Sequence, residues 1–322
     1  MKASICPRYG LPSELQLVDL PMPVPTEDDI VVKVNASTVN RTDCAILSAT
    51  PIIMRLFTGI LRPKNLVPGT EFSGVVVEAG AAVTKYKAGD RVFGFNDLGL
   101  SAHAEYLAIN TGAAIAQIPE NLTYTQAAAS IEGAHYAFNY INKVNVEQGS
   151  RVLINGASGA IGSALLQFCV ALGAEVIAVS ESKHRELLLT LGASSVIDYT
   201  ETDFTKDAGH YDFVFDVVGS SSYFECRSLL ANNGIYISSE LGRFCQNLYL
   251  PLLTKFWSRK KVIFPIPAAI QESLHYLQQQ IEEEKYIPVL DTIYSLDQVA
   301  EAYAYVMQGK KRGNVVVQIG EQ

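Results

Sequence analysis

The spacing of hydrophobic and polar positions changes partway along this 322-residue chain. Up to about residue 120, short β-branched runs such as Asp29–Asn35 and Gly74–Gly80 are separated by Pro and Gly, which is typical of strands joined by turns. From about residue 125, apolar strands alternate with helical segments. That alternation predicts a parallel, doubly wound sheet, so the chain reads as a β-rich part followed by an α/β part.

The α/β part contains the clearest individual predictions. The predicted strands are Arg151–Ile154, Glu175–Val179, Ser195–Asp198, Phe213–Val217 and Gly234–Ser238. The predicted helices, including those near the end of the chain, are Gln126–Asn139, Lys183–Leu191, Tyr223–Leu230, Ala268–Glu284 and Leu296–Gln308. The run Gly313–Ile319 predicts a strand without a partner nearby, so we expect it to return to the β-rich part. The expected organisation is 1–123, then 124–261, then a return segment at 262–322.

Composition narrows the class of protein. Hydrophobic residues make up 48% and charged residues 18% of the chain, which is typical of a globular protein rather than a disordered one. A net charge of −8 and a pI near 5.2 argue against nucleic acid as a partner. The N-terminus does not read as a signal peptide, and no apolar run approaches bilayer length, so we expect a cytoplasmic protein without stable membrane insertion. The 5 cysteines are scattered and lack a C-x-x-C pair, which favours packing roles over a disulfide framework.

The most informative motif is a glycine-rich turn between a predicted strand and an apolar helix. It follows Val152–Asn155 and precedes a helical run that ends at Gly173. Such a strand–turn–helix context favours a dinucleotide site, with the pyrophosphate at the helix N-terminus. The residues expected to contact it are Gly156, Ser158, Gly159, Ala160, Ile161 and Gly162.

The end of the next strand bears on the choice of cofactor. NAD-binding proteins usually place Asp or Glu about 20 residues after the glycines, whereas this chain has Ser180, followed by Lys183 and Arg185. A hydroxyl with cations nearby suits a 2′-phosphate, so NADPH is favoured over NADH. The alternative is that Lys183 and Arg185 form a solvated first helical turn, and the neighbouring Glu181 supports that interpretation.

Several motifs occur in a characteristic order along the whole chain. They are Ala36–Asp43, Pro68–Val75, Ala88–Gly94, Ala104–Tyr106, the glycine turn, Leu191–Tyr199, Phe215–Gly219 and Gly309–Val316. In this respect the chain resembles the medium-chain dehydrogenase/reductases, in particular their zinc-free quinone-oxidoreductase-like branch. The resemblance implies a GroES-like, partly open β-barrel and a Rossmann domain, an active site in the cleft between them, and a homodimer.

The resemblance also indicates that this chain lacks zinc ligands found in other members of the family. Zinc-dependent relatives carry a Cys where this chain has Asn40 and a His where it has Thr70. Cys44, Glu71 and His103 are an alternative set of ligand-type residues, since a catalytic zinc needs three that converge. We expect no metal, and without a Lewis acid the reduction of a conjugated acceptor is easier than the oxidation of an alcohol.

Three residues are candidates for the chemistry. Asn40 resembles a family position beside the nicotinamide and is expected to orient the substrate, or alternatively to cap a helix that begins near Arg41. His135 lies near where relatives present a Thr, and is either a hydrogen-bonding group or a packed histidine. Tyr136 follows it and could donate a phenolic proton.

The resemblance adds further cofactor contacts. Tyr199 resembles a position that touches the 2′-phosphate, and Asn314 resembles a tail residue that reaches the cofactor. The adenosine-side loop is represented by Val218 and Gly219, and the nicotinamide side by Glu240, Leu241 and Gly242. Apart from the tail, these positions follow predicted strands, where such folds bind ligands, although each is also compatible with an ordinary turn.

The sequence therefore predicts a zinc-independent, NADPH-dependent reductase that acts on a small hydrophobic quinone or other α,β-unsaturated carbonyl. The alternatives are an NADP-dependent alcohol dehydrogenase and a non-catalytic protein that senses NADPH or a quinone. Two apolar segments with basic residues, 51–63 and 248–261, could line or cover the substrate pocket. They could equally contact a second subunit, belong to the core or rest on a membrane surface.

Overall fold

The computed structural model describes residues 1–320, which form two compact units. Unit 1 comprises Met1–Glu132, Ile270–Glu282 and the described chain from Ile287 onward. Unit 2 comprises Gly133–Ala269 and Glu283–Tyr286. The chain thus leaves unit 1 at Gly133 and returns to it at Ile270, apart from Glu283–Tyr286, which belong to unit 2.

The divisions between the units lie some residues later than the predicted limits of 123/124 and 261/262. The helix α3 (Tyr124–Ala129) packs against strands of the sheet in unit 1, so it belongs to that unit. The strand β13 (Lys261–Ile263) pairs with β12 (Leu230–Ser238) and so belongs to unit 2.

Unit 1 is built on a seven-stranded sheet that is antiparallel except between β14 and β15. Its path runs β14-β15-β3-β4-β5-β7, with β6 paired to β3, and β1 and β2 form a separate pair. The bounds are β1 Lys2–Ile5, β2 Gln16–Asp19, β3 Asp29–Val39, β4 Glu71–Ala79, β5 Arg91–Phe95, β6 Tyr106–Asn110, β7 Ile115–Gln117, β14 Leu290–Ser295 and β15 Asn314–Gln318. The tail strand β15 lies antiparallel to β3, which confirms the predicted return.

Helices cover the sheet of unit 1 where it carries apolar side chains. The helices are α1 Arg41–Ser48, α2 Met54–Thr58, α3 Tyr124–Ala129, α9 Ile270–Glu282 and α10 Val299–Met307. Helix α10 contacts α1 and strands β3, β14 and β15, and its Tyr303 is fully buried in the shared core. Because α1 follows β3 after a single residue, Asn40, the polar residues around this junction are held between packed elements.

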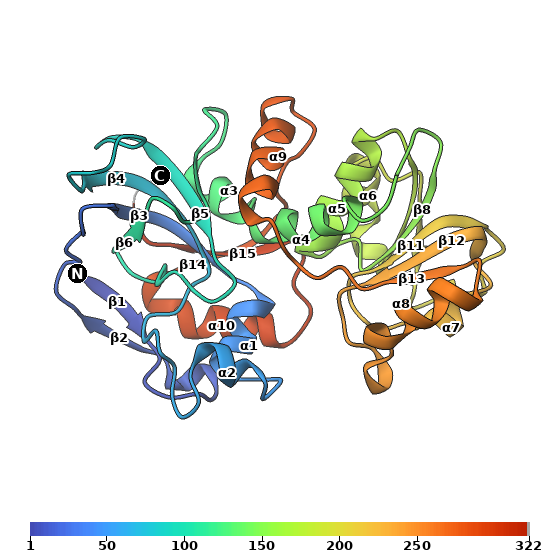
Figure 1. The fold of residues 1–322 in the computed structure, drawn as a ribbon, viewed down its shortest axis with the longest axis horizontal. Helices are drawn as coiled ribbons and strands as arrows, with labels where there is room; N and C mark the ends of the chain where they lie inside the picture. The colour runs from blue at the N-terminus through green and yellow to red at the C-terminus, as the bar shows by residue number, and fades with distance from the viewer. Residues whose placement is uncertain (321–322) are drawn as a thin grey trace. The chain divides into compact units, whose positions relative to one another are not determined.

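Unit 2 is built on a six-stranded sheet whose strands are all parallel. Its order is β10-β9-β8-β11-β12-β13. Strands β8 to β10 follow one another toward one edge of the sheet, and β11 to β13 follow one another from β8 toward the other edge. The bounds are β8 Arg151–Asn155, β9 Glu175–Ser180, β10 Ser195–Asp198, β11 Tyr211–Asp216, β12 Leu230–Ser238 and β13 Lys261–Ile263. This is the strand order of dinucleotide-binding folds, and the predicted doubly wound sheet is confirmed (Figure 1).

The helices of unit 2 differ from the predicted ones in several places, and one of them, Gln246–Trp257, was not predicted. They are α4 Glu132–Ile141, whose first residue belongs to unit 1, α5 Ala160–Ala171, α6 Arg185–Thr190, α7 Tyr223–Cys226 and α8 Gln246–Trp257. The predicted helix Tyr223–Leu230 is too long, because Leu230 already pairs in β12. The predicted helix Gln126–Asn139 is interrupted, because the Ser130 hydroxyl bonds to the Ala127 carbonyl where α3 ends.

The two apolar segments singled out in the sequence carry exposed apolar side chains, although Leu250 packs into the core of unit 2. In 51–63, Leu61 is 88% exposed, and in 248–261 Trp257 is 81% exposed, so neither side chain lies in a core. Within residues 1–320, no helix is long and apolar enough to cross a membrane.

Candidate functional site

The glycine turn of unit 2 has a geometry that only glycine satisfies at two positions. Gly156 has a φ of +87°, and a Cβ there would lie 2.1 Å from Val218 Cγ2. At Gly162, a Cβ would lie 2.2 Å from the carbonyl oxygen of Gly156. The turn therefore folds back on itself and against the loop after β11, as the predicted roles of the glycines require.

The third glycine leaves room for a ligand. Gly159 is the N-cap of the 12-residue helix α5 and provides no side-chain cap for its first amides. A Cβ at Gly159 would meet only the Gly156 carbonyl oxygen, at 3.6 Å. The amides of Ala160, Ile161 and Gly162 belong to the first helical turn, whose N–H groups lack intrahelical acceptors. This uncapped helix N-terminus fits the pyrophosphate of a dinucleotide.

A buried carboxylate shapes the neighbouring loop at the end of β11. The Asp216 side chain is fully buried and accepts hydrogen bonds from the amides of Val218, Gly219 and Ser221, at 2.8–3.1 Å. The side chain of Asn155, at the end of β8, donates to it at 3.0 Å. Asp216 thus joins the ends of two strands and holds Val218 against the glycine turn.

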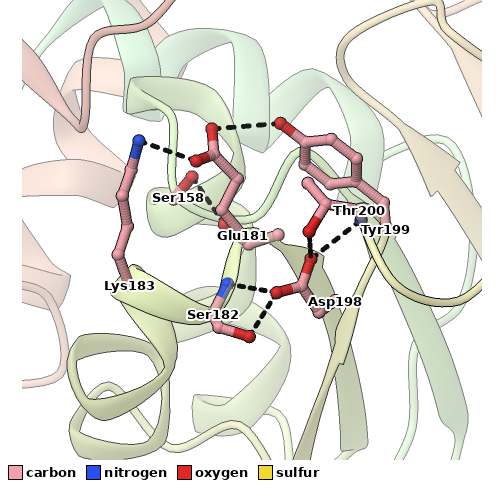
Figure 2. A network of polar contacts seen from close by, with 8 residues as sticks. Ser158, Glu181, Ser182, Lys183, Asp198, Tyr199 and Thr200 are labelled. Carbon is pink, nitrogen blue, oxygen red and sulfur yellow. Dashed lines mark hydrogen bonds and ion pairs between the residues drawn. The ribbon is translucent and has the colours of Figure 1, made fainter.

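The end of β9 carries the polar network shown in Figure 2. The Ser180 hydroxyl donates to the hydroxyl of Ser158 in the glycine turn, at 2.9 Å. Lys183 and Tyr199 both direct their polar ends toward Glu181: the ammonium lies 2.7 Å from Oε2, and the phenol donates to Oε1 at 3.1 Å. The hydrogen bond from Lys183 holds the pKa of Glu181 below its usual range. The end of β9 thus carries two sets of contacts: Ser180 with Ser158, and Lys183 and Tyr199 with the ionised carboxylate of Glu181.

The remaining predicted cofactor residues occupy different surroundings. Leu241 is 41% exposed at the end of β12, Gly242 has a φ of +69°, and the Glu240 carbonyl accepts a hydrogen bond from Asn247 at 2.8 Å. In unit 1, Asn314 is 1% exposed and donates to the Val289 carbonyl, while its Oδ1 lacks a hydrogen-bond partner within residues 1–320. These predicted contacts stay predictions.

His135 and Tyr136 lie on α4 in unit 2. His135 is 2% exposed, and burial lowers the pKa of its imidazole to about 4, so the ring is neutral at physiological pH. Tyr136 is half-buried and meets His135 edge-on, with ring centroids 5.5 Å apart. A neutral imidazole can donate or accept a hydrogen bond, so the catalytic role of His135 stays a prediction, as does that of Tyr136.

Asn40 lies in unit 1, where its carboxamide is held by three groups. Its Nδ2 donates to Thr38 Oγ1 at 2.9 Å and to Glu71 Oε1 at 2.8 Å, and its Oδ1 accepts from Lys311 Nζ at 2.9 Å. Asn40 also stands at the N-cap position of α1, where its backbone N–H donates to Asp43 Oδ2 at 2.9 Å. The Asp43 side chain therefore caps the start of α1, whereas the Asn40 side chain bonds to Thr38, Glu71 and Lys311.

Three buried carboxyl groups surround this junction. Glu71 accepts from the hydroxyl of Thr38 and from the backbone N–H of Glu132, the latter at 2.7 Å. The hydroxyl of Thr70 lies 3.3 Å from Asp43 Oδ2 and 3.2 Å from Glu132 Oε2. All three residues are buried, with exposed fractions of 5% or less. We call Asp43, Glu71 and Glu132, with the Lys311 ammonium, the carboxyl cluster.

Burial governs the protonation of the carboxyl cluster. Loss of solvation raises the pKa of Asp43 to about 7 and that of Glu71 to about 8, in spite of the hydrogen bonds that each accepts. Burial also raises the pKa of Glu132, and the neighbouring Glu71 and Asp43 raise it further. Below neutral pH, the cluster therefore retains protons that an exposed carboxylate would release.

Replacing Asp43 by asparagine is expected to flatten the pH dependence of stability. Because the folded-state pKa of Asp43 is above its unfolded value, the folded protein binds the extra proton between about pH 4 and 7. The stabilisation is present at the acidic end and is lost as the pH rises through 7, by up to about 1.4 kcal/mol per pH unit. The free energy of unfolding of Asp43→Asn, measured with denaturant from pH 5 to pH 8 (~3 units), should lack this decrease.

A control of opposite sign is available in unit 2. Asp203 has a pKa below its usual value, because Thr205 and Lys206 bond to its carboxylate. Asp203→Asn should therefore lose stability relative to the parent protein as the pH rises from acid, rather than gain it. If the free energy of unfolding changes with pH in the same way in Asp43→Asn and in the parent protein, Asp43 does not have a raised pKa in the folded state.

The alternative set of metal ligands does not converge. The Cys44 thiol lies 4.0 Å from the Tyr303 carbonyl oxygen, and His103 Nε2 lies 2.9 Å from the Thr38 carbonyl oxygen. Among residues 1–320, no group of three His, Cys, Asp or Glu side chains is placed to hold a metal ion.

Two members of the carboxyl cluster were absent from the sequence-based site. Glu132 opens a helix in an Ala-rich run, and Lys311 lies in the basic run Lys310–Arg312, which reads as a solvated surface. The available signal was that Lys311 lies within the tail motif Gly309–Val316. Its partner Asn40 is 271 residues away in sequence, so no local pattern indicates the contact.

Comparison with known proteins agrees with this architecture. Residues 26–120 match the model of the alcohol dehydrogenase GroES-like domain, and residues 191–317 match that of the zinc-binding dehydrogenases. The first match confirms the GroES-like domain that the resemblance predicts for unit 1.

Individual relatives cover most of the chain. A quinone oxidoreductase-like protein 2 homolog of Nematostella vectensis is 31% identical over 272 residues, which are 78% of this chain and 73% of that protein. A 2-methylene-furan-3-one reductase of Solanum lycopersicum is 29% identical over 98% of this chain and 79% of its own length. The structure of the quinone oxidoreductase from Coxiella burnetii superposes with a TM-score of 0.84 at 27% identity, covering 99% of both chains.

The two units, the strand order of unit 2 and the glycine turn agree with these matches, as do the ordered motifs of the sequence. The chain belongs to the medium-chain dehydrogenase/reductase superfamily, in its quinone-oxidoreductase-like branch, and is an oxidoreductase of that type.

Proposed function

We propose that the chain is a zinc-independent reductase that uses NADPH to transfer a hydride to a quinone or another α,β-unsaturated carbonyl. The observation that carries this proposal is the uncapped N-terminus of α5, with its glycine turn facing the polar network of Ser180, Lys183 and Tyr199. A 2′-phosphate beside that network would find hydroxyl and ammonium donors. The names of the relatives, a quinone oxidoreductase-like protein and a 2-methylene-furan-3-one reductase, support the acceptor class.

Different residues of the chain would bind the cofactor and orient the acceptor. The amides of Ala160, Ile161 and Gly162 would bind the pyrophosphate, and Lys183 would bind the 2′-phosphate. When bound, NADPH supplies the hydride. Asn40 would contribute to orientation of the acceptor, and His135 or Tyr136 would supply a hydrogen bond near the reacting groups.

Two other activities are tested by the same experiment. An NADP-dependent alcohol dehydrogenase would reduce NADP with an alcohol, and a sensing protein would bind NADPH without oxidising it. The test is oxidation of NADPH and of NADH, followed by absorbance, against a panel of quinones and enones with and without a chelator. Turnover with NADPH that survives the chelator is expected.

Each alternative has its own result. Turnover only with an alcohol, or loss of activity in the chelator, would support the dehydrogenase. Binding of NADPH without oxidation across the panel would support the sensing protein. We also propose that the protein acts as a homodimer in the cytoplasm, and sedimentation at several protein concentrations would reveal a monomer if that is wrong.

A further inference from the structure

The ammonium of Lys311 occupies an unusual position in unit 1. It lies in the tail between α10 and β15, and it donates to Asn40 Oδ1 at 2.9 Å and to the Gly313 carbonyl at 3.0 Å. A lysine ammonium has three N–H groups. Within residues 1–320, these two acceptors leave one N–H of Lys311 without a protein partner.

The Asn40 carboxamide fixes the ammonium by its dipole. The oxygen end faces the positive charge of Lys311, and the NH₂ end faces the carboxyl group of Glu71. Rotating the amide by half a turn would place the NH₂ group against the Lys311 ammonium, so the orientation with the oxygen toward Lys311 is preferred. Because both N–H groups of Asn40 are already donated, the next available donor at this junction is Lys311.

Burial and the surrounding groups shift the pKa of the Lys311 ammonium in opposite directions. Burial lowers the pKa of Lys311, and the carboxyl groups of Glu132 and Glu71 oppose that effect. Cys44 on α1 and Asp291 on β14 act in the same direction as the two glutamates. A cation with a lowered pKa releases its proton more readily than an exposed lysine, while it can still stabilise a negative charge.

We propose that the Lys311 ammonium stabilises and then protonates the substrate oxygen that becomes negative when the acceptor takes up hydride. This inference rests on the proposed reductase function. As the hydride bonds to the acceptor, an electron pair moves onto the acceptor oxygen. An N–H bond of Lys311 then breaks and an O–H bond forms, giving an enol or a hydroquinone. The neutral amine regains its proton from solvent, so charge and protons balance.

The neighbours of Lys311 in the tail have other surroundings. Lys310 is exposed. Arg312 is tied to β14, since its backbone N–H donates to Asp291 and its guanidinium donates to the Leu290 carbonyl. The tail therefore presents a single ammonium to the carboxyl cluster, and Lys310 provides a matched control.

The test compares Lys311→Met, Lys311→Arg and the control Lys310→Met in the full chain, with the best acceptor from the panel. The measurements are NADPH affinity, the circular dichroism of the fold, and the rate of NADPH oxidation in a single turnover at saturating NADPH. Lys311→Met should slow hydride transfer by about 100-fold, as loss of an oxyanion donor does. Lys310→Met should match the parent protein.

Lys311→Arg keeps the charge but cannot release a proton at physiological pH, so it is expected to fold and to be slower by at least about tenfold. This variant decides the matter if Lys311→Met does not fold. Parent-like rates in a folded Lys311→Met, or in Lys311→Arg if the methionine variant does not fold, would overturn the inference. So would a loss confined to NADPH affinity. A parent protein that fails to oxidise NADPH with any quinone or enone of the panel would instead contradict the proposed function itself.

Discussion

Replacing Gly156 by alanine is expected to weaken NADPH binding by about 10- to 100-fold. The new Cβ would lie 2.1 Å from Val218 Cγ2, so either the glycine turn or the Val218 loop must move. Overpacking of this kind costs about 1–3 kcal/mol, and the positive φ adds about 1–2 kcal/mol. If the protein relieves the clash by opening the turn, cofactor binding must close the turn again and restore the clash. The free energy of binding becomes less favourable by that amount, and 1.4 kcal/mol corresponds to tenfold in affinity.

Gly149 provides the matched control for this prediction. It has a φ of +84°, close to that of Gly156, but a Cβ there would meet no atom within 4 Å. Gly149→Ala therefore carries the same backbone strain without the contact, and it should leave NADPH affinity unchanged while lowering stability slightly. Calorimetric titration of both variants checks this. Equal affinities for the two would mean that the turn does not form the cofactor site.

The fold of unit 2 could be predicted because its strands and helices alternate and are mostly long enough to show a period. The predicted strand Ser195–Asp198 matches β10 in both bounds. The strand β13 escaped prediction because three residues, Lys261–Ile263, are too few to show a pattern. The end of α7 was missed for a different reason: pairing with β11 begins at Leu230, and the helical pattern does not record that partner.

In the candidate site, too, one part could be predicted from local sequence and another could not. The glycine turn could be predicted, since its residues are contiguous and its flanks are regular. The carboxyl cluster could not, because burial of Glu132 and Lys311 depends on partners far away in sequence. In a linear reading, a charged residue is assigned to the surface, which is its usual place. Only the packing of α1, β4 and the tail reveals that these charges are enclosed.

Replacing Lys183 by alanine is expected to weaken NADPH binding by about 10- to 100-fold and to leave NADH binding within about twofold. A hydrogen bond to a charged group contributes about 1.5–3 kcal/mol, which a phosphate would lose. The variant also removes the ion pair with Glu181, whose carboxylate keeps its hydrogen bond from the phenol of Tyr199 (Figure 2). An uncompensated carboxylate repels a 2′-phosphate but accepts hydrogen bonds from the ribose hydroxyls of NADH.

The matched control is Lys206, which also pairs with a carboxylate in unit 2, at 3.0 Å from Asp203, and whose side chain is 80% exposed. Lys206→Ala should alter neither affinity. Glu181→Gln should act in the opposite sense to Lys183→Ala, raising NADPH affinity relative to NADH because the repulsive charge is gone while the ammonium stays. Equal losses of both cofactors in Lys183→Ala would make Lys183 a surface charge. In that case, the ionised Glu181 beside the hydroxyls of Ser180 and Tyr199 would favour NADH as the physiological cofactor.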